Sequence, residues 1–354
     1  MKKATVAVGL SGGVDSALSA ALLQQAGYQV TGVYLECYRQ HGCSSQQDRQ
    51  DALAVALHLG IPFQSLDFRA AYQEKVLAYF YQRYQQGDTP NPDLLCNREI
   101  KFGLFADWVK QQGFNYLATG HYASIKQGRL HTGTDSKKDQ TYFLSLVEPI
   151  IWQRVIFPLS AFTKEQVRAK ARALGLPNAD KKDSTGICFV GEVAMRDFLQ
   201  DKVQASPGEV VLQIDGEKKV VGEHRGLPFY TLGQRHGLDL KLSTTNAPVY
   251  YVKEKNWQKN QLLIADKASL MTKQFNFRVL SLSFNQACDA LDKKQLWVKI
   301  RHQGKMVPVV GLSQSRVILA QALFAPASGQ FAVFYQHDAD GGYYCLGAGE
   351  IVNG

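Results

Sequence analysis

The residues best suited to chemistry form a glycine loop near the N-terminus, with the sequence Ser-Gly-Gly-Val-Asp-Ser at positions 11–16. An apolar run at residues 5–10 precedes this loop and apolar residues at helical spacing follow it, so a strand, the loop and a helix are expected in that order. Backbone N–H groups of such a loop converge on an anion, and glycine lets the backbone approach a phosphate closely. The hydroxyls of Ser11 and Ser16 are further donors, and Asp15 is placed to hold the Mg²⁺ that accompanies ATP or to position the loop. The pattern therefore predicts an ATP site.

The loop differs from the Walker loop because no lysine follows its glycines. The Walker lysine reaches the β- and γ-phosphates in kinases and GTPases. Residues 11–16 resemble instead the S-G-G-x-D-S signature of the PP-loop pyrophosphatases, and this resemblance implies AMP and pyrophosphate as products. The alternative is a glycine turn that only tightens the packing of a strand on a helix.

The elements that must position this loop alternate between strand-like and helix-like segments, which indicates an α/β domain with a doubly wound parallel sheet. The expected strands are residues 5–10, 30–35, 62–66 and 116–119, and the expected helices are residues 14–27, 48–59, 70–84 and 102–109. A further helix is expected at residues 163–174, with Thr163 as N-cap and Gln166 at the capping-box position.

Later segments have a different texture, with short β-like runs separated by glycine and proline. Six such runs near the C-terminus suggest a small β-barrel; they are residues 277–282, 296–302, 306–310, 317–320, 331–335 and 343–346. Earlier runs at 208–214, 220–221 and 249–252 indicate a smaller β-rich domain. We therefore expect a catalytic domain at 1–204, a small central domain at 205–274 and a C-terminal β-barrel at 275–354.

The composition limits the class of protein. The chain has 354 residues, of which 45% are hydrophobic and 20% charged, as in soluble globular proteins. No apolar run approaches the ~18 residues that a membrane helix needs. Lys2 and Lys3 precede a short apolar run, as in a signal peptide, but that run enters the glycine loop, so a cytoplasmic protein is expected. The net charge of +9 suggests a polyanionic partner, although a merely soluble basic protein fits equally well.

Six scattered cysteines without a secretory signal do not predict a disulfide framework; they are Cys37, Cys43, Cys96, Cys188, Cys288 and Cys345. Cys96 follows a proline-containing turn, is flanked by Arg98 and Lys101 and is expected at a helix N-terminus, all of which favour a thiolate. Cys188 lies on a Ser-Thr-Gly loop after the lysines at 181–182. For either cysteine taken alone, a buried small hydrophobe is the better interpretation.

The segments around these two cysteines, residues 91–102 and 181–192, closely resemble the two cysteine motifs of the bacterial tRNA-specific 2-thiouridylases. Residues 120–122, 138–144 and 231–235 resemble shorter motifs of the same family. Because these matches run in order over nearly the whole chain, the chain is identified as a member of that family.

The resemblance implies ATP-dependent 2-thiolation of the wobble uridine of tRNA. Cys188 would receive persulfide sulfur from a cysteine desulfurase or a relay protein, and the ATP loop would adenylate the C2 oxygen of uridine. The persulfide, or sulfide released from it, would attack C2, and Cys96 would attack the persulfide bridge, leaving a disulfide between the two cysteines. Adenylation is needed because oxide is a poor leaving group. Asp93 would act as general acid or base, a surface carboxylate being the alternative.

The resemblance also implies two sets of contacts. The ATP contacts would be Gly9, Leu10, Ser11, Gly12, Gly13, Val14, Asp15, Ser16, Leu35 and Gly120, at the carboxyl ends of strands. The tRNA contacts would be Asn91, Pro92, Asp93, His121, Lys138, Asp139, Gln140, Arg301, His302 and Gln330, around a uridine that must leave its stack. At His302 the family more often has tyrosine, so a stacking face is exchanged for a smaller, titratable ring.

As partners, the resemblance implies glutamate, glutamine and lysine tRNAs, bound partly by the C-terminal barrel, and a monomeric enzyme. As cofactors it implies ATP with Mg²⁺, persulfide sulfur as co-substrate and no tightly bound metal. Cys37, His41 and Cys43 are spaced like part of a zinc site, but three ligands do not complete one, so a loop without metal is expected.

Several alternatives stay open from the residues alone. His121 fits a structural histidine, and residues 137–139 fit a solvated charge run. An amidating enzyme would share the adenylation step and use an amine as nucleophile, which would leave both cysteines idle. A non-catalytic RNA-binding module with a decayed ATP loop would fit the basic charge.

Overall fold

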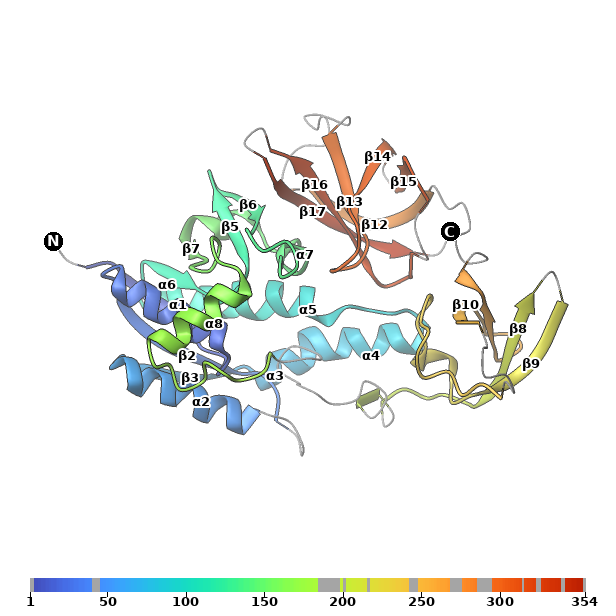
Figure 1. The fold of residues 1–354 in the computed structure, drawn as a ribbon, viewed down its shortest axis with the longest axis horizontal. Helices are drawn as coiled ribbons and strands as arrows, with labels where there is room; N and C mark the ends of the chain where they lie inside the picture. The colour runs from blue at the N-terminus through green and yellow to red at the C-terminus, as the bar shows by residue number, and fades with distance from the viewer. Residues whose placement is uncertain are drawn as a thin grey trace.

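The computed structural model describes residues 3–39, 45–183, 198–199, 202–214, 217–241, 248–267, 276–284, 295–313, 315–322, 326–338 and 341–352. Figure 1 shows an α/β part that contains the N-terminus, a β-barrel beside it and a smaller sheet at the far end of the molecule. Within these ranges no helix is long and apolar enough to cross a membrane.

The first part is built on a parallel sheet with the strand order β3-β2-β1-β4-β7. Its strands are β1 (Thr5–Gly9), β2 (Gln29–Glu36), β3 (Phe63–Asp67), β4 (Tyr116–Ala118) and β7 (Val155–Ile156). On β1, Val6 and Val8 join one buried apolar cluster whereas Ala7 joins another. Since successive side chains of a strand point to opposite faces, both faces of the sheet are covered. The predicted doubly wound sheet is confirmed.

The helices of this part are α1 (Val14–Gln25), α2 (Ser45–Leu59), α3 (Arg69–Tyr72), α4 (Ala78–Gln85), α5 (Pro92–Leu95), α6 (Phe105–Gln111), α7 (Thr141–Leu144) and α8 (Lys164–Ala173). Two π-helices, η1 (Gln73–Leu77) and η2 (Cys96–Leu104), join α3 to α4 and α5 to α6, and a 3₁₀-helix, η3, covers Pro149–Arg154. At the start of α8, Thr163 and Gln166 form the predicted capping box, with each side chain accepting a hydrogen bond from the other residue's N–H.

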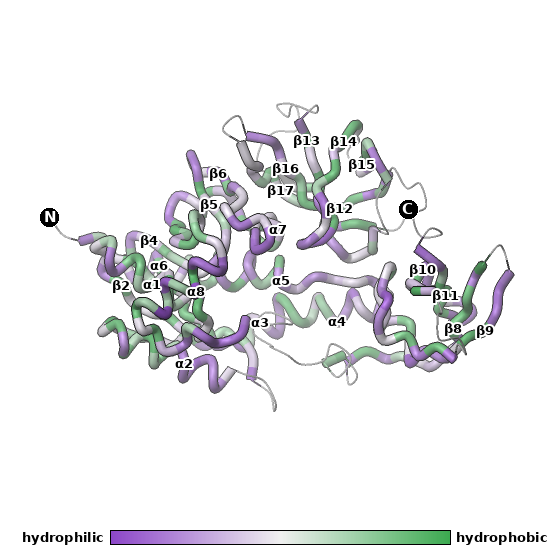
Figure 2. The backbone as a smooth tube through the Cα atoms, viewed as in Figure 1, coloured by the Kyte–Doolittle hydropathy of each residue, from purple (hydrophilic) through white to green (hydrophobic). Residues whose placement is uncertain are grey.

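The central domain is a four-stranded sheet with the order β10-β11-β8-β9. Its elements are β8 (Gly208–Ile214), β9 (Glu217–His224), the short 3₁₀-helix η4 (Leu227–Phe229), β10 (Tyr251–Asn256) and β11 (Gln261–Ala265). In Figure 2 the inner strand β8 is largely hydrophobic and the edge strand β9 largely hydrophilic, as expected for an edge strand that faces water. The predicted β-rich central domain is confirmed.

The C-terminal strands are β12 (Asn276–Phe284), β13 (Leu296–Lys299), β14 (Val307–Leu312), β15 (Arg316–Leu319), β16 (Phe331–His337) and β17 (Tyr343–Val352). Their order is β12-β15-β14-β13-β16-β17, and β12 also pairs with β17. This last pairing closes the sheet on itself, so the predicted small barrel is confirmed.

A hairpin that the sequence analysis did not predict ties the barrel to the first part. It consists of β5 (Ala123–Lys126) and β6 (Arg129–Thr132), and β6 pairs with β17 through His131 and Tyr344. The tie is reinforced by Tyr142 on α7, whose hydroxyl donates to the carbonyl of Phe331 at 2.9 Å. Arg83 on α4 adds ion pairs with Asp88 and with Glu350 on β17. The barrel is therefore held against the helices that follow β3.

Candidate active site

The predicted ATP loop connects β1 to α1 in a conformation that requires glycine. Gly12 has a φ of 78°, and a Cβ atom at this position would lie 2.4 Å from the carbonyl oxygen of Asp48, so only glycine fits there. The Ser16 hydroxyl accepts the N–H of Ser11 at 3.1 Å and donates to the carbonyl of Gly13 at 3.0 Å. These bonds fix the loop above the N-terminus of α1, where backbone N–H groups are available to an anion.

The remaining predicted ATP contacts lie at the same edge of the sheet. Gly120 follows β4, and a Cβ atom on it would lie 2.7 Å from the backbone nitrogen of Ser16 and 2.8 Å from the carbonyl carbon of Asp15. Leu35 lies near the carboxyl end of β2. Strand order reverses between β1 and β4, which is the point at which an open α/β sheet binds its ligands. The sheet thus brings the predicted ATP residues together.

Asp15 on the loop is held by two side chains from later segments. The hydroxyl of Tyr122 donates to its Oδ1 atom at 2.8 Å, and the Nζ atom of Lys164 lies 2.8 Å from each of its oxygens. Lys164 is the first residue of α8. Burial, followed by the negative charge of Asp15, raises the pKa of Tyr122, so this phenol stays protonated and donates. A lysine is therefore present at the loop in space although none follows the glycines in sequence.

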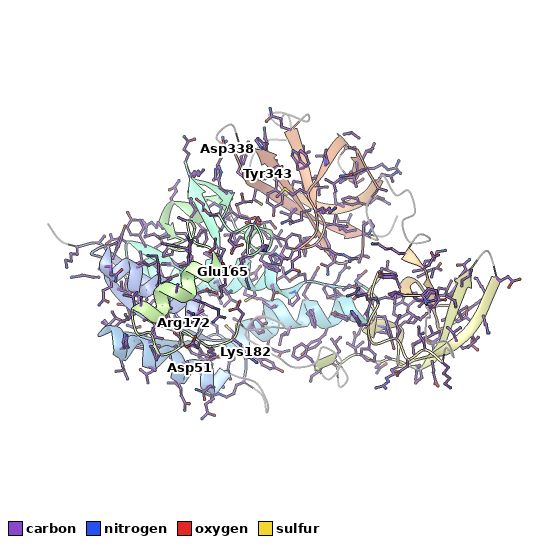
Figure 3. All side chains as sticks on the ribbon, viewed as in Figure 1. Asp51, Glu165, Arg172, Lys182, Asp338 and Tyr343 are labelled. Atoms are coloured by element: carbon purple, nitrogen blue, oxygen red, sulfur yellow. The ribbon has the colours of Figure 1, made fainter. Side chains whose placement is uncertain are left out.

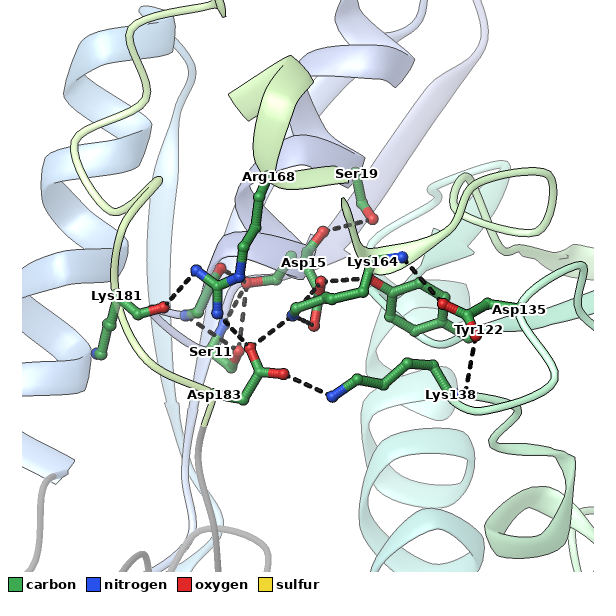
Figure 4. Close-up of polar contacts among 12 residues, drawn as sticks. Ser11, Asp15, Ser19, Tyr122, Asp135, Lys138, Lys164, Arg168, Lys181 and Asp183 are labelled. Atoms are coloured by element: carbon green, nitrogen blue, oxygen red, sulfur yellow. Dashed lines mark hydrogen bonds and ion pairs between the residues drawn. The ribbon is translucent and has the colours of Figure 1, made fainter. Parts of the chain in front are cut away.

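Asp183 is the second carboxylate of this charged group, which we call the cation cluster: Lys138, Lys164 and Arg168 around Asp183 (Figure 4). Each of the three cations lies 2.7 Å from an oxygen of Asp183. Burial alone would raise the pKa of Asp183, but hydrogen bonds from Lys138 and Lys164 outweigh that effect and hold the pKa at about 2. Asp183 is therefore ionised at neutral pH.

The segment before Asp183 is also fastened to the loop. Asn178 donates to the carbonyl of Gly12 at 2.9 Å. Lys181 donates to Asp48 at 2.7 Å and to Asp51 at 2.5 Å. Cys188 lies outside the described residues, as do His41 and Cys43 of the loop for which no metal was expected.

Cys96 lies one helical turn inside the helix that starts at Pro92. Asn91 is the N-cap of this helix, and its side chain accepts the N–H of Asp93 at 3.1 Å. Cys96 directly follows the four-residue α5 and begins η2. Its side chain is fully buried in an apolar cluster to which both the helices and the barrel contribute. Phe331 of β16 belongs to this cluster. The sequence predicted a reactive setting, whereas the thiol is enclosed in this conformation.

The two cations that flank Cys96 in sequence have partners of their own. Arg98 pairs with Glu99 at 2.7 Å, and the Nζ atom of Lys101 lies 3.5 Å from Nε2 of His121. His121 is 7% exposed, and its Nδ1 atom lies 2.7 Å from the hydroxyl of Thr119. Burial, and then the charge of Lys101, lowers the pKa of His121 well below its usual value. The imidazole is therefore neutral and interior, so contact with tRNA would require it to move.

In the loop before α7, all three predicted tRNA contacts bind protein groups. Asp139 is 4% exposed and accepts the hydroxyl of Thr141 at 2.9 Å. Gln140 accepts the N–H of Tyr122 at 3.0 Å. Burial raises the pKa of Asp139. Lys138 pairs with Asp183 at 2.7 Å and keeps 42% of its side chain open to solvent.

The barrel residues converge on the start of the Cys96 helix. The ring of His302 lies 4.4 Å from that of Phe143 on α7, and the carbonyl of Phe143 accepts the side chain of Asn97 at 3.2 Å. Gln330 donates to the carbonyl of Thr89 at 2.5 Å. Arg301 donates to the carbonyl of Leu232 at 3.1 Å, which brings in the central domain. All three domains thus meet around residues 89–97.

Asn97 and Phe143 were not assigned roles from the sequence, and neither were Lys164 and Arg168. A signal existed for the last two, because they stand one turn apart just after the predicted N-cap Thr163. Within the described ranges, no group of His, Cys, Asp or Glu side chains is arranged to hold a metal ion. A cavity of about 380 Å³ has Leu95 and Arg98 in its wall but none of the predicted ATP residues, so it lies apart from the predicted ATP site.

Comparisons with known proteins cover all three domains. Residues 4–192 match a family model described as "tRNA methyl transferase HUP domain". Residues 196–266 match "tRNA methyl transferase PRC-barrel domain", and residues 273–351 match "Aminomethyltransferase beta-barrel domain".

Full-length relatives give a more specific description. The chain is 41% identical over 361 residues to the tRNA-specific 2-thiouridylase MnmA of Neisseria meningitidis serogroup C, which covers 98% of this chain and 95% of the relative. It is 40% identical over 375 residues to the tRNA-specific 2-thiouridylase MnmA 1 of Geobacillus kaustophilus, with 99% of this chain and 96% of the relative covered.

Among solved structures, the U34-tRNA thiolase NcsA of Methanococcus maripaludis is similar over 56% of this chain and 63% of its own, with 19% identity and a TM-score of 0.37. A similarity this low does not indicate a shared function. Two of the family-model descriptions name a methyl transferase. We assign the family from the relatives, because each aligns with all three domains at about 40% identity. The chain belongs to the tRNA-specific 2-thiouridylase family.

Proposed function

We propose that this protein adenylates the C2 oxygen of the wobble uridine of tRNA and then replaces that oxygen with sulfur, releasing AMP and pyrophosphate. The nucleotide half rests on the loop at the reversal point of the sheet. Gly12 packs closely on Asp48 and Gly120 on Ser16, and this packing supports the loop beside the N-terminus of α1. The substrate is assigned from the full-length relatives, which are tRNA-specific 2-thiouridylases.

The residues around the loop fit ATP with its Mg²⁺. The N–H groups at the start of α1 are suited to the pyrophosphate, and Asp15 offers the carboxylate that a magnesium ion prefers. Asp15 now accepts hydrogen bonds from Tyr122 and Lys164, so metal contact requires Lys164 to give up at least one of these oxygens. The metal would neutralise charge on the phosphates, and the N–H groups would hold pyrophosphate as it departs.

The sulfur half uses two cysteines. A persulfide on Cys188 attacks C2 of the adenylated uridine, and the bond from C2 to the AMP oxygen breaks. The Cys96 thiolate then attacks the Cys188 sulfur, the bond between that sulfur and the transferred sulfur breaks, and 2-thiouridine is released. The resulting disulfide requires two electrons from an external thiol before the next cycle. A buried Cys96 means that tRNA binding must open the contact between the helix and the barrel.

Asp93 is proposed as the general acid or base, and Asn91 and Pro92 shape the pocket for the flipped base. As N-cap, Asn91 fixes the backbone of Asp93. The proposed partners are glutamate, glutamine and lysine tRNAs and a cysteine desulfurase or sulfur-relay protein, with a monomeric enzyme in the cytoplasm. The proposed division remains residues 1–204 for catalysis, 205–274 for the central domain and 275–354 for the tRNA-binding barrel.

The test is reconstitution with purified protein, a tRNA transcript, ATP with Mg²⁺ and a persulfide donor. AMP is quantified by chromatography, and 2-thiouridine by mass spectrometry of digested tRNA. We expect one AMP for each 2-thiouridine, and loss of 2-thiouridine in Cys188→Ser. Full sulfur transfer in that variant would remove Cys188 from the mechanism. Pyrophosphate release that depends on a small amine and ignores tRNA would instead identify an amidating enzyme.

A further inference from the structure

In the cation cluster three cations pair with one carboxylate, that of Asp183. Lys164 is only 12% exposed and Arg168 23% exposed, yet both direct their charges to Asp183, and Lys164 also contacts Asp15 on the ATP loop. Desolvating cations in this way costs free energy that ion pairing only partly offsets. Such an arrangement is typical of a site that receives an anionic ligand.

The position of Lys164 links the cluster to the nucleotide site. Its Nζ atom lies within 2.8 Å of Asp15, whose neighbour Ser16 closes the glycine loop. Figure 4 shows Lys164 between the two carboxylates, with Arg168 approaching from one turn further along α8. A triphosphate seated at the start of α1 therefore comes within reach of both side chains, and charge-assisted bonds to phosphate are among the strongest polar contacts available.

In this structure a carboxylate of the protein itself, that of Asp183, pairs with Lys164 and Arg168. Its carboxylate takes the charges of Lys164 and Arg168 at 2.7 Å each. Asp135 also binds Lys164, but through the backbone, since it accepts the N–H of Lys164 at 3.0 Å. Asp183 is the group that a phosphate must displace.

We infer that Lys164 and Arg168 bind the β- and γ-phosphates of ATP, and that Asp183 is an internal competitor which holds these two cations until the nucleotide takes them. The inference rests on the proposed function, since it assigns phosphate-binding residues to that ATP site. It also gives the site cations that its glycine loop lacks. In sequence Asp183 stands shortly before Cys188, so displacement of Asp183 by ATP would couple nucleotide occupancy to the segment that carries the sulfur.

The test is calorimetric titration of the full-length protein with ATP and Mg²⁺, and separately with AMP and with inorganic pyrophosphate. Asp183→Asn removes the competitor, so its Kd for ATP and pyrophosphate should fall about 5- to 20-fold, while its Kd for AMP changes less than about twofold. Lys164→Gln should raise the Kd for ATP at least about tenfold. In a Lys164→Gln/Arg168→Gln background, Asp183→Asn should no longer tighten binding, because the two cations for which Asp183 competes with phosphate are absent.

Matched controls are available on the same helix. Arg172 on α8, labelled in Figure 3, pairs with Asp180 at 2.8 Å, and both side chains are mostly exposed. Arg172→Ala and Asp180→Asn should leave every Kd within about twofold, since exposed pairs contribute little. Melting curves confirm that each variant is folded.

Two failures are distinguishable. If the unaltered protein binds neither ATP nor pyrophosphate, the proposed function fails. If it binds both, but Asp183→Asn binds them equally or more weakly, Asp183 is a structural ion-pair partner and the inference is wrong. Should Asp183→Asn unfold, the Lys164→Gln titration decides alone, and an unchanged Kd overturns the inference.

Discussion

Around the ATP loop, charged side chains from distant segments meet at the edge of the first domain's sheet, whereas around Cys96 apolar side chains of helices and barrel enclose a thiol. Asp15, Lys164 and Asp183 are each partly open to solvent, but Cys96 is fully buried. The loop needs only an exchange of ions to accept a nucleotide. The thiol needs packed surfaces to separate. Under the proposed function we therefore expect the two halves of the site to respond to different ligands, the loop to ATP and the thiol to tRNA.

The largest expected effect comes from Cys96→Ser. Because the mechanism uses this thiol to release the transferred sulfur, formation of 2-thiouridine should fall at least about 10³-fold. ATP binding measured by calorimetry should stay within about twofold, since none of the loop contacts described above involves this thiol. Cys345 is the control, because burial raises the pKa of its thiol to about 12 and makes it inert. Equal losses in Cys96→Ser and Cys345→Ser would contradict a chemical role for Cys96.

Gly12→Ala tests whether the loop at residues 11–16 is needed for AMP formation. The new methyl group would overlap the carbonyl of Asp48, at a residue whose φ is 78°, so AMP formation should fall about 10²-fold and stability by about 1–3 kcal/mol. Gly27→Ala is matched, since Gly27 has a φ of 89° but no atom within 4 Å of its Cβ position. It should lose stability without loss of AMP formation. Similar AMP formation in both variants would mean that the loop is only a turn.

The enclosure of Cys96 predicts a response to tRNA that ATP does not produce. Site-resolved alkylation followed by mass spectrometry should show slow modification of Cys96 in the protein alone. Saturating tRNA should accelerate it about tenfold, whereas ATP alone should change it less than about twofold. Cys345 should stay unmodified in each condition. Fast alkylation of Cys96 without tRNA would show that the thiol is already accessible, and would contradict the claim that only tRNA exposes it.

The smallest expected effect is a pH dependence at His302. Burial, and then the charges of Lys299 and Lys138, lowers the pKa of this imidazole from 6.5 to about 4. The unfolded chain therefore binds the proton first, so stability is complete above pH 6.5 and is lost as pH falls from 6.5 toward 4. Discounted for partial exposure, the loss is about 1–2 kcal/mol.

Urea unfolding at several pH values checks this contribution. Between pH 6.5 and 4 the unfolding free energy of His302→Gln should fall less than that of the unaltered protein by this amount. Parallel curves for the two proteins would show that His302 titrates normally. The result concerns the surroundings of Cys96, because His302 packs on Phe143 and the carbonyl of Phe143 accepts a hydrogen bond from Asn97, the residue after Cys96.

Much of the fold was predictable because its signals are local. The strand before the glycine loop, the capping box of Thr163 and Gln166 and the six barrel strands each follow from neighbouring residues. The missed hairpin also had a local signal, since Gln127 and Gly128 form its two-residue turn, both with positive φ. Two-residue turns of this kind are typical of hairpins.

The rest of the site depends on contacts between residues far apart in the chain. Lys164 reaches Asp15 across 149 positions, and no pattern near either residue indicates the pairing. The π-helical segment that begins at Cys96 has no sequence period of its own, and the burial of this thiol depends on strand β16 of the barrel. The sequence predicts a chemical role for Cys96, but only the packing of two domains determines that its thiol is enclosed.

The adenylation step can be tested most directly with tRNA that carries oxygen-18 at C2 of the wobble uridine. The protein would be incubated with this tRNA, ATP with Mg²⁺ and a persulfide donor, and the phosphate-containing products would be examined by mass spectrometry. Our account predicts one labelled oxygen in the phosphate of AMP for each 2-thiouridine formed. Label in inorganic phosphate together with ADP, or unlabelled AMP alongside 2-thiouridine, would contradict it.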